Sequence, residues 1–457
     1  MTDITRELVR FAKETNLSDI NDKVVQEVKK SILDTLGVTI AGRRTEVAEK
    51  IVDYVSNAKG IGNSSVLGES FKTIPSFAAL ANGTMGHALD FDDSNKLLNG
   101  HGSVTTFPAS LALSEKNQSS GAQFIEAYLL GFEVASKLGS VLNMELYENG
   151  WHPTAVLGSV GSCVSSIHLT NLSADEACSA LGIVSSQASG LRANFGTMTK
   201  PFHAGMAAES GVRSVELASL GMTSNQNIFE ANSGYASVFS KLEKIQDGDF
   251  ISSLGNPFCF ESPGVDIKPY PCCMSSYNAI EGMFSIIKEE RVKLEDVESI
   301  EVGLLESGFL NLSYHRPKTG LQAKFSVEYI LSRVLKDENL TIKTFTDELV
   351  NDPLIQEFMG KIDVKVDNEL EWEHPMPKPT LLKVATKNGK LYERTIYTAR
   401  GKAEMPLSLE EVELKFRECV DGLLEIETTD KVINIVNDLD REKSIAPLMK
   451  ALSGCNN

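Results

Sequence analysis

Apolar side chains recur at three- and four-residue intervals through the first half of the chain. In Val24–Val38 this spacing gathers the apolar residues into one stripe and leaves the charged residues on the other side. Such a stripe is buried when helices pack against one another. The pattern therefore predicts a bundle or stacked array of helices from Thr2 to about Phe239.

Three of the later helical segments are rich in small residues: Ala155–Ile167, Ala180–Gly190 and Ala204–Leu220. Glycine costs about 1 kcal/mol relative to alanine in a helix interior, so these helices form only where close packing compensates. Membrane helices also use small residues for close approach, but the polar Glu209 and Arg213 in the last segment argue against that reading. We expect these helices at the centre of a large all-α core.

The pattern changes near Asn256–Lys268, where prolines and a glycine interrupt the helical spacing. Strand-like alternation follows, with helical segments between the strands at Ser275–Lys288 and Val327–Leu335. Asn388 and Gly389 separate two alternating runs, which predicts a β-hairpin with a type I′ turn. The predicted strands lie in Ser299–Leu304, Ile362–Val366 and Leu381–Tyr397.

The C-terminal stretch returns to amphipathic helix, with Ser408 as an N-cap before Glu410 and Glu411. A chain of 457 residues also exceeds the roughly 250–300 residues at which single cores stop growing. We therefore predict a mainly α protein with two domains. A large all-helical domain comprises residues 1–264 and 403–457, and a smaller α+β domain comprises residues 265–402.

Charge and cysteine content narrow the classes of function. The chain carries 44 basic and 62 acidic residues, for a net charge of -18, and has no Lys/Arg-rich block, which disfavours nucleic acid as a partner. An anionic small molecule requires a few cationic side chains that converge locally. With no signal peptide, no membrane-spanning apolar run and an odd number of cysteines without a CxxC pair, we expect a soluble cytoplasmic protein with reduced thiols.

The densest group of ionisable residues lies in Asn82–Ser103. One interpretation is an acidic helix cap followed by a solvated loop. A metal site is another, because hard cations prefer carboxylate oxygens, but neither an EF-hand spacing nor HExxH is present, and we expect no metal. The third interpretation is a catalytic cluster. The group consists of His87, Asp90, Asp92, Asp93, Ser94, His101 and Ser103.

Two further segments place a histidine or a lysine at a predicted helix start. His152 precedes Pro153, a residue favoured in the first helical turn, and is either a proton donor or acceptor near neutral pH or a core histidine. Lys200 and His203 lie where a small-residue helix begins. A helix N-terminus attracts anions, so Lys200 is either part of a carboxylate site or an exposed loop lysine.

Lys268 lies at the predicted join between the two domains, in Ile267–Cys273. Clefts between domains are preferred ligand sites, so this lysine is a further candidate for binding substrate. The adjacent Cys272 and Cys273 lack a paired base, and we expect them to be packing residues instead of nucleophiles.

Taken together, five separated motifs resemble the MmgE/PrpD family, which includes 2-methylcitrate dehydratase, cis-aconitate decarboxylase and iminodisuccinate epimerase. The resemblance implies a large helical domain built from both chain ends, a smaller α+β lid, a homodimer and no organic cofactor. The motifs are SILDTLGVTIAG at Ser31–Gly42, NGTMGHALDFDD at Asn82–Asp93, WHPTAVLGSVGS at Trp151–Ser162, TKPFHAGMAAESG at Thr199–Gly211 and IKPYPCC at Ile267–Cys273.

The resemblance also implies roles for individual residues. Two lysines would clamp the carboxylates of a small polycarboxylic acid, two histidines would transfer protons next to a carboxylate, and an aspartate would orient a histidine. The catalytic candidates are Asp90, His101, His152, Lys200 and Lys268. The candidates for binding substrate are Ser94, His203 and Tyr314.

The sequence departs from the decarboxylase branch of this family at two places. Ser94 replaces a threonine, and the HPS motif reads His101-Gly102-Ser103. These differences leave the substrate open. We expect a lyase that dehydrates 2-methylcitrate or citrate or decarboxylates cis-aconitate, or else an epimerase of a dicarboxylate such as iminodisuccinate. Metal-dependent prenyl-diphosphate chemistry and a non-catalytic helical scaffold are the alternatives outside this class.

Overall fold

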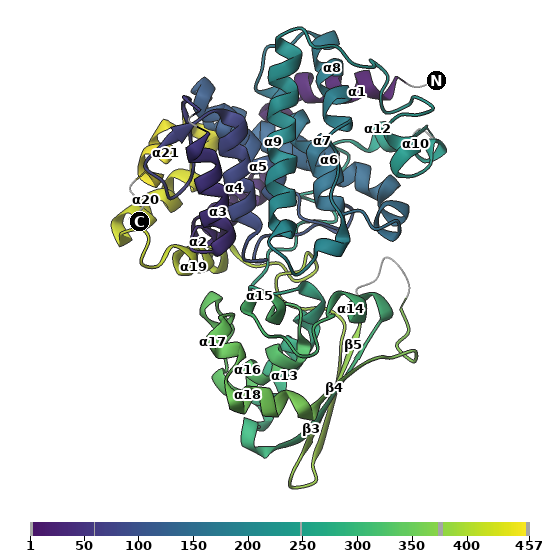
Figure 1. Cartoon of the computed structure of the whole chain (residues 1–457), viewed down its shortest axis with the longest axis vertical. Coiled ribbons are helices and arrows are strands. Elements are labelled where there is room, and N and C mark those ends of the chain that lie inside the picture. The colour runs from purple at the N-terminus through teal and green to yellow at the C-terminus, as the bar shows by residue number, and fades with distance from the viewer. Residues whose placement is uncertain (1–2, 59, 247–248, 373–377, 454–457) are drawn as a thin grey trace. The chain divides into compact units, whose positions relative to one another are not determined.

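The computed structural model describes residues 3–58, 60–246, 249–372 and 378–453. The chain forms two compact units, Met1–Ile267 with Ser408–Asn457, and Lys268–Leu407 (Figure 1). The first unit is almost entirely helical and the second combines helices with a small sheet, so the predicted mainly α fold class is confirmed. None of the helices in the described ranges has both the length and the apolar character needed to cross a membrane.

The first unit contains one short antiparallel pair of strands, β1 (Ser64–Ser65) and β2 (Lys72–Thr73), besides its helices. Its C-terminal helices belong to the same unit as its N-terminal ones. The helices are α1 (Ile4–Glu14), α2 (Asp22–Gly42), α3 (Glu46–Asn57), α4 (Pro75–His87), α5 (Ser103–Asn117), α6 (Gly121–Glu148), α7 (Pro153–His168), α8 (Ala174–Ser185), α9 (Thr199–Ser219), α10 (Tyr235–Phe239), α11 (Leu242–Gln246), α12 (Asp249–Ser253), α19 (Leu409–Val420), α20 (Ile426–Asn437) and α21 (Ala446–Leu452).

Small residues allow the central helices to approach closely, as predicted. Helix α9 runs through the first unit and packs against α4, α5 and α7 (Figure 1). A Cβ atom added to Gly205 would lie 2.2 Å from the Leu80 carbonyl oxygen, and one added to Gly83 would lie 2.9 Å from the Gly205 Cα. The same closeness joins α6 to α7, where a Cβ on Gly131 would lie 2.5 Å from the Gly161 carbonyl oxygen.

This packing gives a direct test. We expect Gly205→Val to destabilise the protein by about 3 kcal/mol or more, because the added side chain meets backbone that cannot move aside. The measurement is the free energy of unfolding in denaturant. Gly308→Ala, in α14 (Glu306–Asn311), is the matched control, because its Cβ would approach no atom closer than 3.9 Å. A loss of stability in Gly308→Ala as large as that in Gly205→Val would contradict the packing argument.

The second unit is a four-stranded sheet with helices. The strand order is β4-β3-β5-β6, with β3 parallel to β4 and antiparallel to β5. Helices α13 and α16 contribute buried side chains to the same core as the sheet. The elements are α13 (Tyr277–Glu290), β3 (Val297–Leu304), α14 (Glu306–Asn311), α15 (Gly320–Ala323), α16 (Val327–Asp337), α17 (Asp347–Val350), α18 (Pro353–Phe358), β4 (Ile362–Val366), β5 (Thr380–Thr386) and β6 (Leu391–Ile396).

The predicted hairpin forms between β5 and β6, but its turn is of a different type. A type I′ turn needs positive φ at both central residues, and here Gly389 has φ +83° whereas Asn388 lacks a positive φ. The Gly389 N–H donates to the Thr386 carbonyl, and the Thr386 N–H donates to the Lys390 carbonyl. The loop therefore has one more residue than a type I′ hairpin, with glycine at the left-handed position, and the type I′ prediction was wrong.

The predicted N-cap at Ser408 is confirmed. The Ser408 hydroxyl accepts a hydrogen bond from the Glu411 N–H at 3.2 Å, and the Glu411 carboxylate accepts one from the Ser408 N–H at 2.8 Å. This reciprocal capping box satisfies two amide donors that the first turn of α19 would otherwise leave unpaired. Helix α19 therefore starts at a defined residue where the chain returns to the first unit.

Candidate active site

Four histidines lie together in the first unit, although they come from four separate segments. His87 is the last residue of α4, His101 precedes α5, His152 is the N-cap of α7 and His203 is in the first turns of α9. The ring of His87 lies 4.5 Å from that of His101 and 6.1 Å from that of His152, between centroids. The rings of His152 and His203 are 5.4 Å apart. The helix ends thus bring together imidazoles that are far apart in sequence.

Asp92 is a carboxylate shared by two of these imidazoles. The Nδ1 atom of His87 lies 2.9 Å from Oδ2 of Asp92, and Nδ1 of His101 lies 3.0 Å from the same oxygen. His101 Nδ1 also lies 2.7 Å from the carbonyl oxygen of Asp93. Two acceptors at one nitrogen indicate that Nδ1 of His101 carries the proton, which leaves Nε2 as the reactive nitrogen.

Sequence reasoning did not select His87 and Asp92 as site residues. Both lie in the run Asn82–Ser103 that was singled out for its ionisable residues, but the family resemblance directed attention to Asp90 and His101. The spacing His87-x4-Asp92 at a helix end was the available signal. In the structure Asp92 holds two histidines, the role that was expected of Asp90.

Asp90 instead pairs with Lys200. The Lys200 ammonium lies 2.6 Å from Oδ1 of Asp90, and both side chains are buried. Asp90 has φ +51°, the left-handed region that costs a non-glycine residue of order 1 kcal/mol or more. The ammonium lies 5.5 Å from the centroid of the Phe195 ring. Two residues 110 positions apart are therefore fixed side by side next to the histidines.

His152 and His203 form a second polar pair. Their Nδ1 atoms are 3.2 Å apart, so one must donate and the other accept. Burial is the main reason that the pKa of each lies below the ordinary histidine value, and Lys200 lowers both further. The ring of Phe195 packs edge-on against His152 with centroids 4.9 Å apart. Both imidazoles are therefore neutral near pH 7.

Helix starts add partial positive charge to this region, which also holds the carboxylates of Asp90 and Asp92. The N–H of His101 donates to Oγ1 of Thr154 in the first turn of α7, at 3.0 Å, which joins the start of α5 to that of α7. Neither Gly102 nor His152, the N-caps of these helices, makes a side-chain cap hydrogen bond. Two helix N-termini, with Lys200 in the first turn of a third, therefore favour an anion.

The protonation states of His87 and Asp92 follow from burial and pairing. Burial lowers the pKa of His87 to about 3, more than the adjacent Asp92 raises it. Burial opposes ionisation of Asp92, yet His87 and His101 outweigh it and hold the pKa of that carboxyl well below its usual range. Within the described residues Nε2 of His87 has no hydrogen-bond partner. His87 is thus a neutral imidazole whose Nδ1–H donates to an ionised carboxylate.

These states predict an NMR signature. We expect the ring nitrogens of His87 and His152 to show no titration between pH 5 and 8, because burial keeps both rings neutral. His87 should give the spectrum of the Nδ1–H tautomer. The measurement is a series of ¹⁵N spectra of ring-labelled protein, with assignment from His87→Gln and His152→Gln. A midpoint near pH 6.5 for either ring would contradict the assignment.

The side chain of Asp93 belongs to a buried polar network. Its Oδ2 accepts hydrogen bonds from Ser31, at 2.8 Å, and from Ser103. Burial raises the pKa of Asp93 to about 7, and the nearby Asp34 and Asp92 add to this against the two serine hydrogen bonds. The Asp93 carboxyl group is therefore partly protonated near neutral pH.

This shift predicts how stability depends on pH. The unfolded Asp93 has a pKa near 3.8, so between about pH 4 and 7 the folded protein holds a proton that the unfolded chain has released. Stability therefore falls as pH rises through this window, by up to about 4 kcal/mol. We expect Asp93→Asn to flatten the curve of unfolding free energy against pH. Asp430→Asn, at an exposed position, is the control; a curve for Asp93→Asn parallel to wild type would refute the shift.

The remaining predicted site residues are distributed over both units. Ser94 follows the aspartates directly, and its N–H donates to the Asp266 carbonyl at 2.9 Å. Lys268 and Tyr314 belong to the second unit; Lys268 is buried, and the half-buried Tyr314 donates its N–H to the Phe325 carbonyl. That Lys268 and Tyr314 act together with the histidines stays a prediction.

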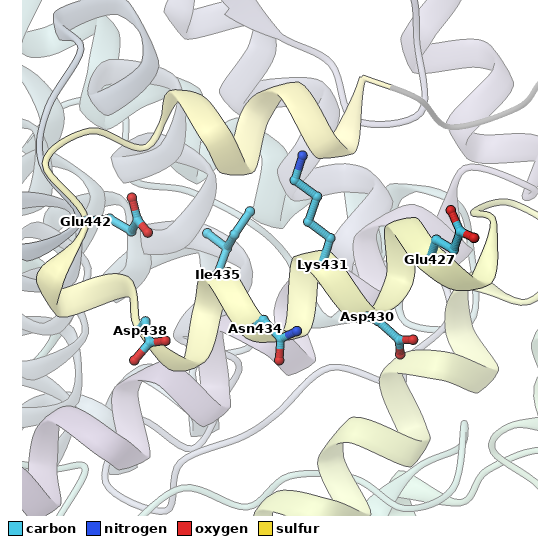
Figure 2. A pocket seen from close by; sticks show the side chains of 7 residues that line it. All are labelled: Glu427, Asp430, Lys431, Asn434, Ile435, Asp438 and Glu442. Atoms are coloured by element: carbon cyan, nitrogen blue, oxygen red, sulfur yellow. The ribbon is translucent and has the colours of Figure 1, made fainter.

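Two other features bear on what the protein binds. His87, Asp92 and His101 place ligand atoms within 4.8 Å of one another and could hold a metal ion, but the 2.7 Å contact of His101 Nδ1 with a carbonyl favours a protonated nitrogen instead. A surface depression along α20 and the turn after it is lined by four carboxylates and Lys431 (Figure 2). Its negative charge makes it a poor site for a polycarboxylate.

Comparison with known proteins identifies the class. The MmgE/PrpD N-terminal domain matches residues 6–247 and the MmgE/PrpD C-terminal domain matches residues 270–441. The chain belongs to the MmgE/PrpD family. It is 27% identical to the cis-aconitate decarboxylases of Mus musculus, over 96% of this chain and 91% of that protein, and of Homo sapiens, over 95% and 91%. It is 25% identical to that of Aspergillus terreus, over 98% and 96%.

Proposed function

We propose that the protein is a lyase that acts on a small di- or tricarboxylic acid by proton transfer next to a carboxylate. The observation that carries this proposal is the carboxylate of Asp92 held between the Nδ1 atoms of His87 and His101, beside the Asp90–Lys200 pair. The relatives named cis-aconitate decarboxylase support the substrate class. Dehydration of 2-methylcitrate or citrate and decarboxylation of cis-aconitate are the candidate reactions.

The proposed chemistry has two parts: positive charge binds a substrate carboxylate, and histidines transfer protons. The Lys200 ammonium, held in place by Asp90, binds a substrate carboxylate together with the positive helix ends. In a decarboxylation the bond to the departing carboxylate breaks, carbon dioxide leaves, and the electron pair remains on the substrate carbon. His101 then delivers a proton from Nε2 to that carbon, with Asp92 stabilising the imidazolium beforehand. His152 is the second acid or base.

The roles of the second unit and of the oligomeric state are expectations from the family resemblance. Lys268 would supply another cation for the substrate, and Ser94, His203 and Tyr314 would contact its polar groups. These steps need neither an organic cofactor nor a metal, because protons are the only species that the side chains transfer. The protein is expected to act as a homodimer in the cytoplasm.

Epimerisation of a dicarboxylate, such as iminodisuccinate, is the second candidate. It uses the same proton transfers without loss of water or carbon dioxide. Two acid/base groups from different helix starts, His101 and His152, favour it because a two-base epimerase removes a proton with one group and returns it with another.

Substrate incubation in deuterated water separates these reactions. Each candidate acid is incubated with the protein, and the products are followed by NMR. A decarboxylase releases carbon dioxide and incorporates deuterium at the carbon that is protonated, and a dehydratase releases water and forms a carbon–carbon double bond. An epimerase exchanges the proton for deuterium without net loss of water or carbon dioxide. Turnover of none of the polycarboxylates, with no thermal stabilisation by any of them, would refute the proposed function.

The shared carboxylate has a predictable kinetic role. We expect Asp92→Asn to lower kcat by about 10²–10⁴-fold, because an amide cannot stabilise the His101 imidazolium and favours the wrong tautomer. Lys200→Ala should mainly reduce the rise in melting temperature that a bound polycarboxylate produces. Glu427→Gln, in the acidic depression of Figure 2, is a matched control that should leave both unchanged. Wild-type kcat in Asp92→Asn would contradict the assignment of His101.

A further inference from the structure

The loop that carries Asp90 and Asp92 is held from the far end of the chain. Lys415, in α19, donates a hydrogen bond to the carbonyl oxygen of Phe91 at 2.8 Å. Its ammonium also lies 3.9 Å from the centroid of the Phe91 ring and 2.6 Å from Oδ1 of Asp34 in α2. The side chains of Lys415 and Asp34 are 6% and 0% exposed. The buried Lys415–Asp34 ion pair therefore holds Phe91, the residue between Asp90 and Asp92.

The position of this contact matters because of the loop's backbone. Asp90 is in the left-handed region, and such a conformation persists only where the surroundings impose it. The Phe91 carbonyl belongs to the peptide group that leads into Asp92. Holding this one group restricts the backbone from which the Asp90 side chain reaches Lys200 and the Asp92 side chain reaches the two imidazoles.

Stability alone is a weak reason for such a pair. Burial of two charges costs desolvation that their attraction only partly offsets, and apolar replacements of buried ion pairs are often neutral or stabilising. We infer that Lys415 is a positioning residue for the loop Asp90–Asp92, which acts through the carbonyl and ring of Phe91 while Asp34 neutralises and aims its ammonium. The effect on turnover rests on the proposed function, whereas the effect on the loop does not.

The chain offers a matched control. Lys29 lies in α2, as Asp34 does, and is as buried as Lys415. Its ammonium lies 2.7 Å from Oδ1 of Asp440, whose side chain is 25% exposed, and 2.7 Å from the Asn437 carbonyl oxygen. This second pair likewise joins α2 to the C-terminal segment, but neither of these contacts involves the loop Asp90–Asp92. Loss of the Lys29–Asp440 pair tests the general effect of removing an ion pair between the same parts of the fold.

The experiment compares two double variants, Asp34→Asn with Lys415→Met, and Asp440→Asn with Lys29→Met. Each removes both charges, so no unpaired buried charge remains. For the first we expect at least about tenfold faster hydrogen exchange of the loop amides and altered ¹⁵N shifts of the His87 and His101 rings. kcat should fall at least about tenfold. The control should show none of these changes, at a comparable melting temperature.

The outcomes separate the two proposals. Loop exchange and ring shifts in the Lys415 variant that match wild type would overturn the positioning role, whatever the activity. The same changes in both variants would also overturn it, because the effect would then be general loosening. If wild type turns over no polycarboxylate, the proposed function fails, while the exchange and NMR comparison still decides whether Lys415 positions the loop.

Discussion

The fold of the first unit depends on the contact of small residues between helices. At Gly83 and Gly205 the backbones of α4 and α9 approach so closely that no other side chain fits between them. Because the helices cannot slide or separate, their ends are fixed as well. The last residue of α4, the residues just before α5 and α7, and the first turns of α9 then carry the ionisable side chains to one place. Close packing of small residues thus determines the geometry of a polar site.

The site keeps its buried ionisable groups by distributing charge unevenly. Asp92 is ionised between two imidazoles, and Asp90 is paired with an ammonium group. His87 and His152 are neutral because burial penalises a second positive charge beside Lys200. Burial likewise penalises the negative charge of Asp93, which raises its pKa so that it holds a proton more readily. Each group's charge is therefore set by its neighbours, and a change at one residue alters the others.

Much of the architecture was predictable because it arises from local pattern. The small-residue helices, the strands and the Ser408 cap each follow from spacing along the chain, and all three are present. The hairpin was predicted but not its turn, because Asn388-Gly389 is compatible with loops of two lengths and the register of the flanking strands decides between them. The dipeptide Asn388-Gly389 alone does not specify the backbone conformation of the turn.

Prediction of the site was less complete for a physical reason. The structure brings His101, His152, Lys200 and His203 into one cluster. The last three were selected at predicted helix starts, and His101 was selected in the ionisable run Asn82–Ser103. The partner of each group depends on side-chain directions after folding, so Asp92 and His87 were overlooked. Lys415 had no signal at all, since it is one lysine in an ordinary amphipathic helix, and only tertiary structure connects it to Phe91.

The contact between Lys415 and Phe91 also has a consequence for biosynthesis. The two residues are separated by 324 positions, so a ribosome that adds 5–20 residues per second makes the lysine roughly 16–65 s after the phenylalanine. Throughout that interval the nascent helices can pack, but the loop Asp90–Asp92 lacks its contact with the Lys415 ammonium. The loop Asp90–Asp92 would thus acquire this contact only after the 324 residues that follow Phe91, up to and including Lys415, have been added.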